Sequence, residues 1–191
     1  MVVKLMIIKK LDEIAEIFNG ARLSRYQDDN GEEFKVFLGT PTNQISWHKE
    51  KISSKLNQKY FSKKNDIILN LQNSQIIKFV NEENIIIPMH YAIIRLNEEY
   101  NAEYIYYYLK TSLFQKQLHK FKEGSSLLFL NLSALKNIKI NLPEKNIQEQ
   151  YVKLFRVLDK KSELRIQENK LLEDFRDLIF KDINKENNIN K

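Results

Sequence analysis

Residues 146–181 read NIQEQYVKLFRVLDKKSELRIQENKLLEDFRDLIFK, a stretch of 36 residues that contains neither glycine nor proline. Apolar residues recur along it at a heptad spacing counted from Ile147, and charges of both signs are interleaved with them. The apolar a and d positions are Ile147, Leu154, Val157, Leu164, Leu171, Phe175 and Leu178. This pattern predicts one long helix, which at about 1.5 Å per residue would extend roughly 54 Å.

A helix of that length extends beyond the edge of a domain of this size, so its own domain cannot cover the whole apolar seam. We therefore expect a homodimer in which two copies of the helix pack antiparallel along the seven apolar positions. Gln150, Lys161 and Glu168 interrupt the seam, which leaves open a second arrangement, with the helix folded back along its own domain. Residues 183–191 are polar and rich in asparagine, and are expected to form a flexible tail.

The preceding part of the chain has the composition of a folded domain. The 191 residues are 42% hydrophobic, and 11 Phe and 9 Tyr can bury large areas, while only 4 Gly and 3 Pro interrupt regular structure. Runs rich in β-branched residues predict strands at 34–38, 66–71, 75–80, 85–87 and 91–96. Residues 10–18 are predicted to form a short helix or a turn that ends at Asn19-Gly20, and helical periodicity predicts a longer helix at 101–121. The predicted organisation is an α+β domain of residues 1–145, a long dimerisation helix of residues 146–182 and the tail.

Most kinds of enzyme active site find no support in the sequence. There is no cysteine, so disulfides, thiolate metal sites and cysteine nucleophiles are excluded. The four scattered glycines cannot form a phosphate-binding loop, and no G-x-S-x-G motif is present. His48, His90 and His119 lack metal-ligand spacing, and His90 and His119 are expected to be structural. We therefore predict no catalytic residue, no metal site and no cofactor.

The sequence also lacks the signals of a membrane or secreted protein. No run of 18 apolar residues occurs, so no segment is expected to span a membrane. The apolar run within residues 1–10 is too short for a signal peptide and is followed by two lysines. A cytoplasmic protein is expected.

The net charge of +6 lies mainly in the predicted domain. Residues 1–145 carry 21 Lys and Arg against 16 Asp and Glu, a balance of +5, and residues 146–191 carry 10 against 9, a balance of +1. Lysines concentrate in residues 48–64 and in residues 110–123. Clustered lysines attract a polyanion and release its counterions, so they favour nucleic-acid binding, although charge alone is also typical of an ordinary solvated surface.

The segment that joins the domain to the helix carries the clearest motif. Residues 124–143 read GSSLLFLNLSALKNIKINLP, and residues 147–150 read IQEQ. This stretch resembles the end of a target recognition domain in the specificity (S) subunits of type I restriction-modification systems, where a leucine-rich run and a proline precede a long helix. Similar motifs lie at residues 10–17 with Gly20, at residues 65–69, where Asn65 replaces the glycine of the family's Gly-Asp-Ile-Leu strand, at residues 104–111 and at residues 171–183.

The resemblance implies a half-length S subunit. Full S subunits have two recognition domains and two long helices, whereas this chain has one of each, so two copies would together replace one complete subunit. The implied partners are double-stranded DNA, a second copy of the chain and a methyltransferase subunit, with a restriction and translocation subunit left open. The chain departs from the family at Glu144, where a second proline is expected, and in the polar middle of its helix. Such a subunit has no catalytic activity of its own.

Side chains that can discriminate base edges or bind phosphates identify the candidate DNA contacts. The candidate base readers are Arg22, Ser24, Arg25, Asn43, Gln44, His48, Gln72, Asn73, Ser74, Ser125 and Ser126. The candidate phosphate contacts are Lys49, Lys51, Lys55, Lys120 and Lys122. For each of them an ordinary surface role is the alternative.

Three other functions stay open at this point. The chain could be a stand-alone DNA-binding regulatory protein without enzyme partners, or a coiled-coil adaptor that binds only proteins. A metal-dependent nuclease is the third, with Asp66 and either Glu82 or Glu83 as carboxylates that converge after a strand. Nothing in the spacing of these carboxylates distinguishes them from turn residues.

Overall fold

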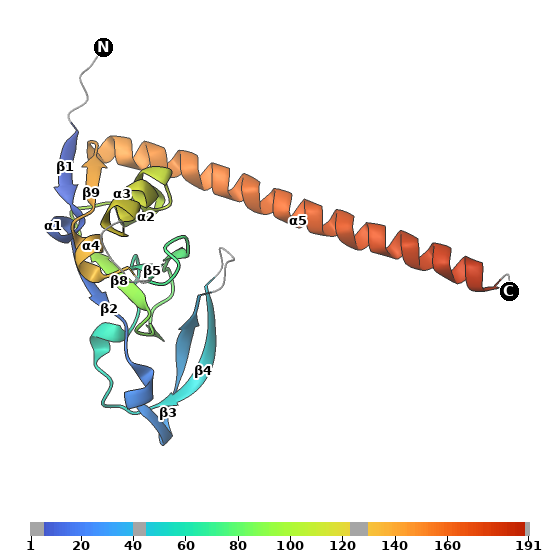
Figure 1. Cartoon of the computed structure of the whole chain (residues 1–191), viewed down its shortest axis with the longest axis horizontal. Helices are drawn as coiled ribbons and strands as arrows, with labels where there is room; N and C mark the ends of the chain where they lie inside the picture. The colour runs from blue at the N-terminus through green and yellow to red at the C-terminus, as the bar shows by residue number, and fades with distance from the viewer. Residues whose placement is uncertain (1–5, 40–44, 123–129, 190–191) are drawn as a thin grey trace, which may run out of the picture. The chain divides into compact units, whose positions relative to one another are not determined.

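The computed structural model describes residues 6–39, 45–122 and 130–189, with the side chains of Lys122 and of residues 182–189 excepted. The chain divides into two compact units, Met1–Glu149 and Gln150–Lys191. Figure 1 shows the elements in chain order, with the second unit formed by the greater part of one long helix. The α+β class expected from the sequence is confirmed.

The first unit holds nine strands and four short α-helices among its described residues, before the long helix α5 begins. The strands are β1 Ile7–Lys10, β2 Ala15–Asn19, β3 Gln27–Leu38, β4 Ser46–Ile52, β5 Ile67–Asn70, β6 Ile77–Phe79, β7 Ile85–Ile86, β8 Tyr91–Leu96 and β9 Lys139–Leu142. The helices are α1 Leu11–Ile14, α2 Ala102–Leu109, α3 Ser112–Lys122, α4 Leu132–Lys136 and α5 Lys145–Ile189, with 3-10 turns at Leu23–Arg25 and Gln58–Tyr60.

The strands form three small sheets. The central sheet has the order β2-β8-β5-β6, and all its neighbouring strands are antiparallel. A second sheet has the order β4-β3-β7, and β1 pairs with β9 in the third. The largest apolar core includes residues of the central sheet and of α1 to α4, while two smaller cores involve β3 and β7. Strand β5 is buried at all four positions, as a continuous apolar run predicts for a strand covered on both faces.

Two sequence predictions are wrong in their local structure. Residues 10–18 were expected to form a short helix or a turn, but the helix α1 ends after four residues and strand β2 follows, because Ala15 and Ile17 are buried when β2 pairs with β8. The helix expected at 101–121 is divided into α2 and α3. Thr111 lies between them, and its hydroxyl accepts a hydrogen bond from the backbone of Phe114, as a residue that begins a new helix does.

Asn65 adopts a left-handed backbone conformation, with φ of 70°. This conformation is open to glycine without steric cost, and asparagine tolerates it better than most other residues. The backbone N–H of Asn65 bonds to the carbonyl of Val80, so the turn before β5 is tied to the end of β6. The replacement of the family's glycine by Asn65 therefore keeps the turn that this motif requires.

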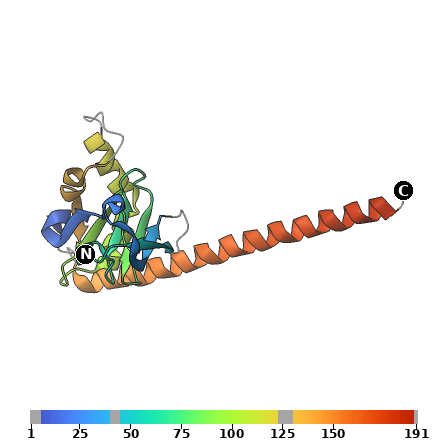
Figure 2. The same cartoon turned by 90° about the horizontal axis from the view of Figure 1, so that it is seen from below.

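Helix α5 is continuous over 45 residues, which confirms the predicted long helix (Figure 2). It also includes residues 183–189, which were expected to belong to a flexible tail. Ile147 is buried at its start, but apolar side chains farther along are exposed, from Tyr151 at 39% to Leu171 at 68%. Within the described part of the chain, no helix is both long and apolar enough to cross a membrane.

Candidate nucleic-acid interface

A groove of about 370 Å³ brings together candidate base readers from distant parts of the sequence. Arg22 and Ser24 reach it from the segment after β2, and His48 reaches it from β4. Met89 and His90 complete one wall from the turn that precedes β8. The remaining lining residues are Ala21, Leu23, Val36, Phe37, Leu38, Gly39, Pro88 and Tyr91. We call this site the hairpin groove, because β3 and β4 form one side of it.

The segment that carries Arg22 and Ser24 is held close to the turn before β8. The N–H groups of Gly20 and Ala21 bond to the carbonyls of Tyr91 and Ile87, at 3.0 and 2.7 Å. A Cβ atom at Gly20 would lie 2.1 Å from the Ile87 carbonyl oxygen, so only glycine permits this approach. The side chains of Arg22 and Ser24 stay exposed while their backbone is fixed.

The candidate phosphate contacts near the hairpin are Lys49 and Lys51 on β4 and Lys55 in the turn that follows it, and none of the three lines the groove. Lys49 forms an ion pair with Glu33 at 2.8 Å, which raises the pKa of Lys49 and lowers the pKa of Glu33. The ammonium of Lys51 donates to the Asp29 carbonyl at 2.9 Å. Lys55 is exposed, and its ammonium has no hydrogen bond or ion pair to any described residue. Lys55 is therefore the most available of these lysines for a phosphate, and Lys49 must first leave its carboxylate.

Tyr91 connects the hairpin to the turn between β5 and β6. Its hydroxyl is hydrogen bonded to the backbone of Gly39 and to the side chain of Asn70, and burial raises the pKa of its phenol. A Cβ atom at Gly39 would lie 2.0 Å from the Tyr91 hydroxyl oxygen, so a side chain there would displace this contact. The Tyr91 ring also packs edge-on against Phe37, with ring centroids 5.0 Å apart. Through these contacts Tyr91 links the end of β3, at Gly39, to the end of β5, at Asn70.

Gln72, Asn73 and Ser74 lie together in the turn after β5, but they differ in accessibility. Gln72 and Asn73 are exposed, whereas Ser74 is buried and its hydroxyl bonds to the side chain of Gln115 in α3 at 3.0 Å. The amide of Gln115 also donates to the Ser74 carbonyl. Ser74 therefore holds the turn against α3, while Gln72 and Asn73 stay exposed and the side-chain oxygen of Asn73 accepts a hydrogen bond from the Gln75 backbone at 3.1 Å. The backbone N–H of Leu71 bonds to the carbonyl of His90, so the turn after β5 is attached directly to a residue that lines the hairpin groove.

The remaining candidates are distributed as follows. A second depression, at the turn after β5, is lined by Gln72 to Gln75 and by Gln115, Leu118 and His119 of α3. Arg25 and Lys120 are exposed, and they line neither this depression nor the hairpin groove. Asn43, Gln44, Ser125, Ser126 and the side chain of Lys122 lie outside the described residues. His90, which the sequence predicted to be structural, lines the groove with Arg22, and its ring is tilted against that of Tyr91 with centroids 4.2 Å apart. Burial lowers the pKa of its imidazole. The only sequence signal for His90 was its place in a turn with a proline, Pro88-Met89-His90, directly before a strand.

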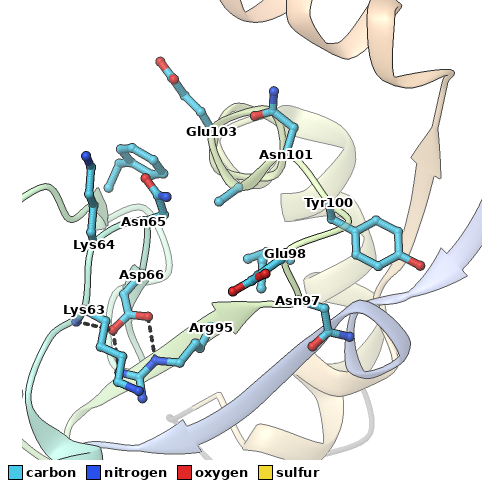
Figure 3. Close-up of a pocket in the computed structure, with 13 residues that line it drawn as sticks. Lys63, Lys64, Asn65, Asp66, Arg95, Asn97, Glu98, Tyr100, Asn101 and Glu103 are labelled. Carbon is cyan, nitrogen blue, oxygen red and sulfur yellow. Dashed lines mark hydrogen bonds and ion pairs between the residues drawn. The ribbon is translucent and has the colours of Figure 1, made fainter.

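Each carboxylate considered for a nuclease is engaged by a cation or a backbone N–H group, and Glu83 accepts a hydrogen bond from the backbone of Lys64 at 3.3 Å. Asp66 is buried and accepts two hydrogen bonds from Arg95, at 2.9 and 2.7 Å, and one from the backbone of Lys63 (Figure 3). Glu82 forms an ion pair with Lys35 instead. Among the described residues, no group of three or more His, Asp or Glu side chains is arranged to hold a metal ion. Asp66 has a structural function, which is to fix the turn before β5 to β8.

Comparison with known proteins identifies the family. The family model described as the type I restriction modification DNA specificity domain matches residues 4–174, so the chain belongs to this family. The family provides the DNA specificity of type I restriction-modification systems and is not their catalytic component. No match is found among curated protein sequences.

Solved structures show the same fold at low sequence identity. The HsdS subunit from Thermoanaerobacter tengcongensis superposes with a TM-score of 0.64 at 17% identity, covering 84% of this chain and 44% of that one. The S subunit from M. genitalium gives a TM-score of 0.54 at 17% identity, with 84% and 40% covered. A chain from a structure of type I restriction-modification complex assembly and conformational transition gives 0.60 at 17% identity, with 82% and 38% covered. The present chain spans less than half the length of each of these proteins.

Proposed function

We propose that this specificity subunit acts as a homodimer that reads a split palindromic DNA site and directs a methyltransferase subunit to it in the cytoplasm. Two copies together then provide the two recognition domains and two helices of a full-length S subunit. A two-fold dimer presents two identical readers in opposite orientation, so the two half-sites are inverted repeats. The exposed apolar face of α5 is the observation that carries this proposal.

Helix α5 exposes a row of apolar side chains to solvent along most of its length, which is unfavourable unless a partner covers them. The predicted seam residues Leu154, Val157, Leu164, Leu171, Phe175 and Leu178 are all more than half exposed, and Ile147 alone is buried. The second unit consists of a single helix, which cannot bury one of its faces by itself. Covering each Leu or Phe side chain contributes about 1.5–3 kcal/mol, which favours association strongly.

The hairpin groove and the turn after β5 are the proposed DNA-reading surface. Arg22 and His48 can donate to base acceptors, and Gln72 and Asn73 can bond to adenine in the bidentate manner of side-chain amides. Lys51 and Lys55 on the hairpin are placed to meet phosphates, and these contacts position the protein without reading sequence. Ser74 is left out of the reading set because its hydroxyl is engaged by Gln115.

Sedimentation equilibrium of the purified chain tests the homodimer. A dimer at micromolar concentration supports the proposal, and a monomer at that concentration overturns it. The double variant Leu158→Glu and Leu172→Glu places charges on the exposed face and should give a folded monomer. Glu173→Ala, an exposed change on the same helix, is the matched control and should remain dimeric.

Two further measurements test DNA reading and recruitment. Arg22→Ala and His48→Ala should change which sequence is selected from a random DNA pool, whereas Lys170→Ala on α5 should leave the selected sequence unchanged. Methylome mapping in cells with and without this chain should show that methylation at one split palindrome depends on it. Unchanged methylation, with no methyltransferase co-purifying, would leave the stand-alone regulatory function in its place. Absence of DNA binding at low salt would favour the protein-binding adaptor.

A further inference from the structure

Three charged residues interrupt the apolar face of α5 near its middle. In the heptad that starts at Ile147, Lys161 and Glu168 occupy a positions and Arg165 occupies an e position. All three side chains are exposed, and within the described part of the chain none forms an ion pair. Charged residues at seam positions reduce the stability of a helix pair but select its orientation and register. These three residues therefore affect the orientation and the register in which two copies of α5 would pack.

The apolar residues define one register for an antiparallel pair. Antiparallel packing brings each a position opposite a d position of the second copy, which sets Leu154 opposite Leu178 and Val157 opposite Phe175. The e positions then face one another: four of them are apolar, and Arg165 faces Arg165 of the second copy at the two-fold axis, flanked by the Glu168 of each copy. Tyr151 meets Ile179 of the second copy, and Leu158 meets Leu172 of the second copy. This register explains why the exposed apolar surface extends beyond the seven predicted seam residues, to Tyr151, Leu158, Leu172 and Ile179.

The same register places opposite charges together at the two-fold axis. Glu168 lies opposite Leu164 of the second copy, between Lys161 and Arg165 of that copy. At about 1.5 Å of rise per residue, Lys161 is offset from Glu168 by about 4.5 Å along the axis and Arg165 by about 1.5 Å, and both long side chains can span these offsets. The arrangement occurs twice because of the symmetry. Lys160 and Asp174 of the second copy, both exposed, form a second complementary pair at facing g positions.

A parallel pair of the same helix would place like charges together. Its a positions face themselves, so Lys161 would meet Lys161 and Glu168 would meet Glu168. Lys160 at a g position would also meet Arg165 at the following e position of the second copy. Apolar contacts alone would permit either orientation, since Leu154, Val157 and Leu171 could each face themselves. The charges decide between the two orientations.

We propose that Glu168, held between Lys161 and Arg165 of a second copy, sets the antiparallel orientation and the register of the homodimer. The inference rests on the proposed homodimer and specifies which residues decide its geometry. We call the charges at positions 161, 165 and 168 the charge code of the helix, because they would select the partner. A half-subunit with only one sign of charge at these positions would pair with a half-subunit of the opposite sign and not with itself.

Charge exchange tests the code by sedimentation equilibrium. Glu168→Lys leaves only cations at the centre and should raise the dimer dissociation constant about tenfold or more, as should the double variant Lys161→Glu and Arg165→Glu. An equimolar mixture of the two variants should form a heterodimer with affinity close to wild type. Glu173→Lys, an equal charge change at an f position that faces away, should change the dissociation constant less than about twofold.

The absence of native cysteine permits a direct test of orientation. A chain with Leu158→Cys mixed with a chain with Leu172→Cys should form a disulfide between the two positions under mild oxidation. Neither variant alone should crosslink. Self-crosslinking of the Leu158→Cys chain would overturn the antiparallel register. A wild-type dimer whose affinity does not respond to Glu168→Lys would refute the charge code alone, whereas a wild-type monomer would refute the proposed homodimer.

Discussion

Asp66 shows how a single buried charge fixes the turn before β5 to β8. Its carboxylate is 1% exposed and binds both Arg95 on β8 and the backbone of Lys63. The hydrogen bonds to Asp66 raise the pKa of Arg95. Removal of one member of a buried ion pair leaves the other charge uncompensated, and this loss exceeds the net contribution of the intact pair. The turn before β5, with Asn65 in its left-handed conformation, depends on this contact.

Asp66→Ala should therefore lower the free energy of unfolding by about 3 kcal/mol, measured by urea denaturation. The matched control is Asp177→Ala on α5, which removes an exposed carboxylate that also contacts an arginine, at 3.3 Å. This change should lower the free energy of unfolding by less than about 0.5 kcal/mol, because solvent screens the exposed pair. Equal effects of the two variants would show that burial of Asp66 does not determine its contribution.

His90 should make DNA binding depend on pH. Burial lowers the pKa of His90 in the free protein, so the imidazole is neutral at pH 7. In the free chain this neutral form contributes stability that is present above the unfolded pKa of about 6.5 and is lost as pH falls toward the folded pKa. Nearby phosphates favour the charged form, so binding near pH 6 takes up a proton and affinity rises as pH falls. Fluorescence anisotropy at pH 7.5 and 6.0 should show this rise in the wild-type chain.

The variant His90→Asn should flatten that pH dependence. Lys170→Ala on α5 lies outside the proposed reading surface and serves as the control, with an expected pH dependence equal to that of the wild-type chain. If His90→Asn and the wild-type chain show the same pH dependence, His90 does not approach DNA phosphates.

At the scale of elements, the hairpin formed by β3 and β4 is held by few contacts outside its own ladder. Its register pairs Phe37 with Trp47 and Val36 with His48. Phe37 and Val36, at the end of β3 that leads to β4, are buried in two different cores, and Ile52 is buried at the opposite end of the hairpin, while most of its lysines stay in solvent. An element anchored in this way can present charge to a duplex without loss of core packing.

Removal of the hairpin lysines should weaken binding to all DNA sequences alike. The triple variant Lys49→Ala, Lys51→Ala and Lys55→Ala should reduce the slope of log affinity against log salt by about 1 for each lysine that contacts a phosphate. Lys49 should contribute least, because Glu33 already neutralises it. Salt titrations followed by anisotropy measure this slope, and Lys170→Ala on α5 should leave it unchanged. An unchanged slope in the triple variant would exclude the hairpin from the DNA face.

At the scale of the whole molecule, α5 of the proposed homodimer would both join two recognition domains and separate them. A helix pair of fixed register keeps the domains at a set distance, so the gap between the half-sites follows the helix length. Seven residues inserted after Ser162 would lengthen each helix by about 10.5 Å and should widen the gap by about 3 base pairs. Selection from random DNA reads the gap directly, and the same seven residues appended after Lys191 should leave it unchanged. A gap that ignores the insertion would show that α5 is not the spacer.

The sequence by itself determined the class of the fold, the long helix and the family, because these depend on local periodicity and on motifs of contiguous residues. The heptad from Ile147 predicted α5, and the run of β-branched residues predicted β5 and β8. Local periodicity failed where tertiary pairing competed with it. Ala15 and Ile17 suit a helix face, but pairing with β8 buries them more completely in a strand.

Only the tertiary structure decided which candidate residues share a surface. It brought Arg22 and His48 together with His90, and it buried Ser74 against Gln115, which no spacing in the sequence indicates. The physical reason is that these contacts join residues far apart in the chain through backbone hydrogen bonds at Gly20, Leu71 and Tyr91, and long-range contacts of this kind have no periodic signature. The chemistry of each side chain is local, whereas its place in a recognition surface is a property of the folded chain.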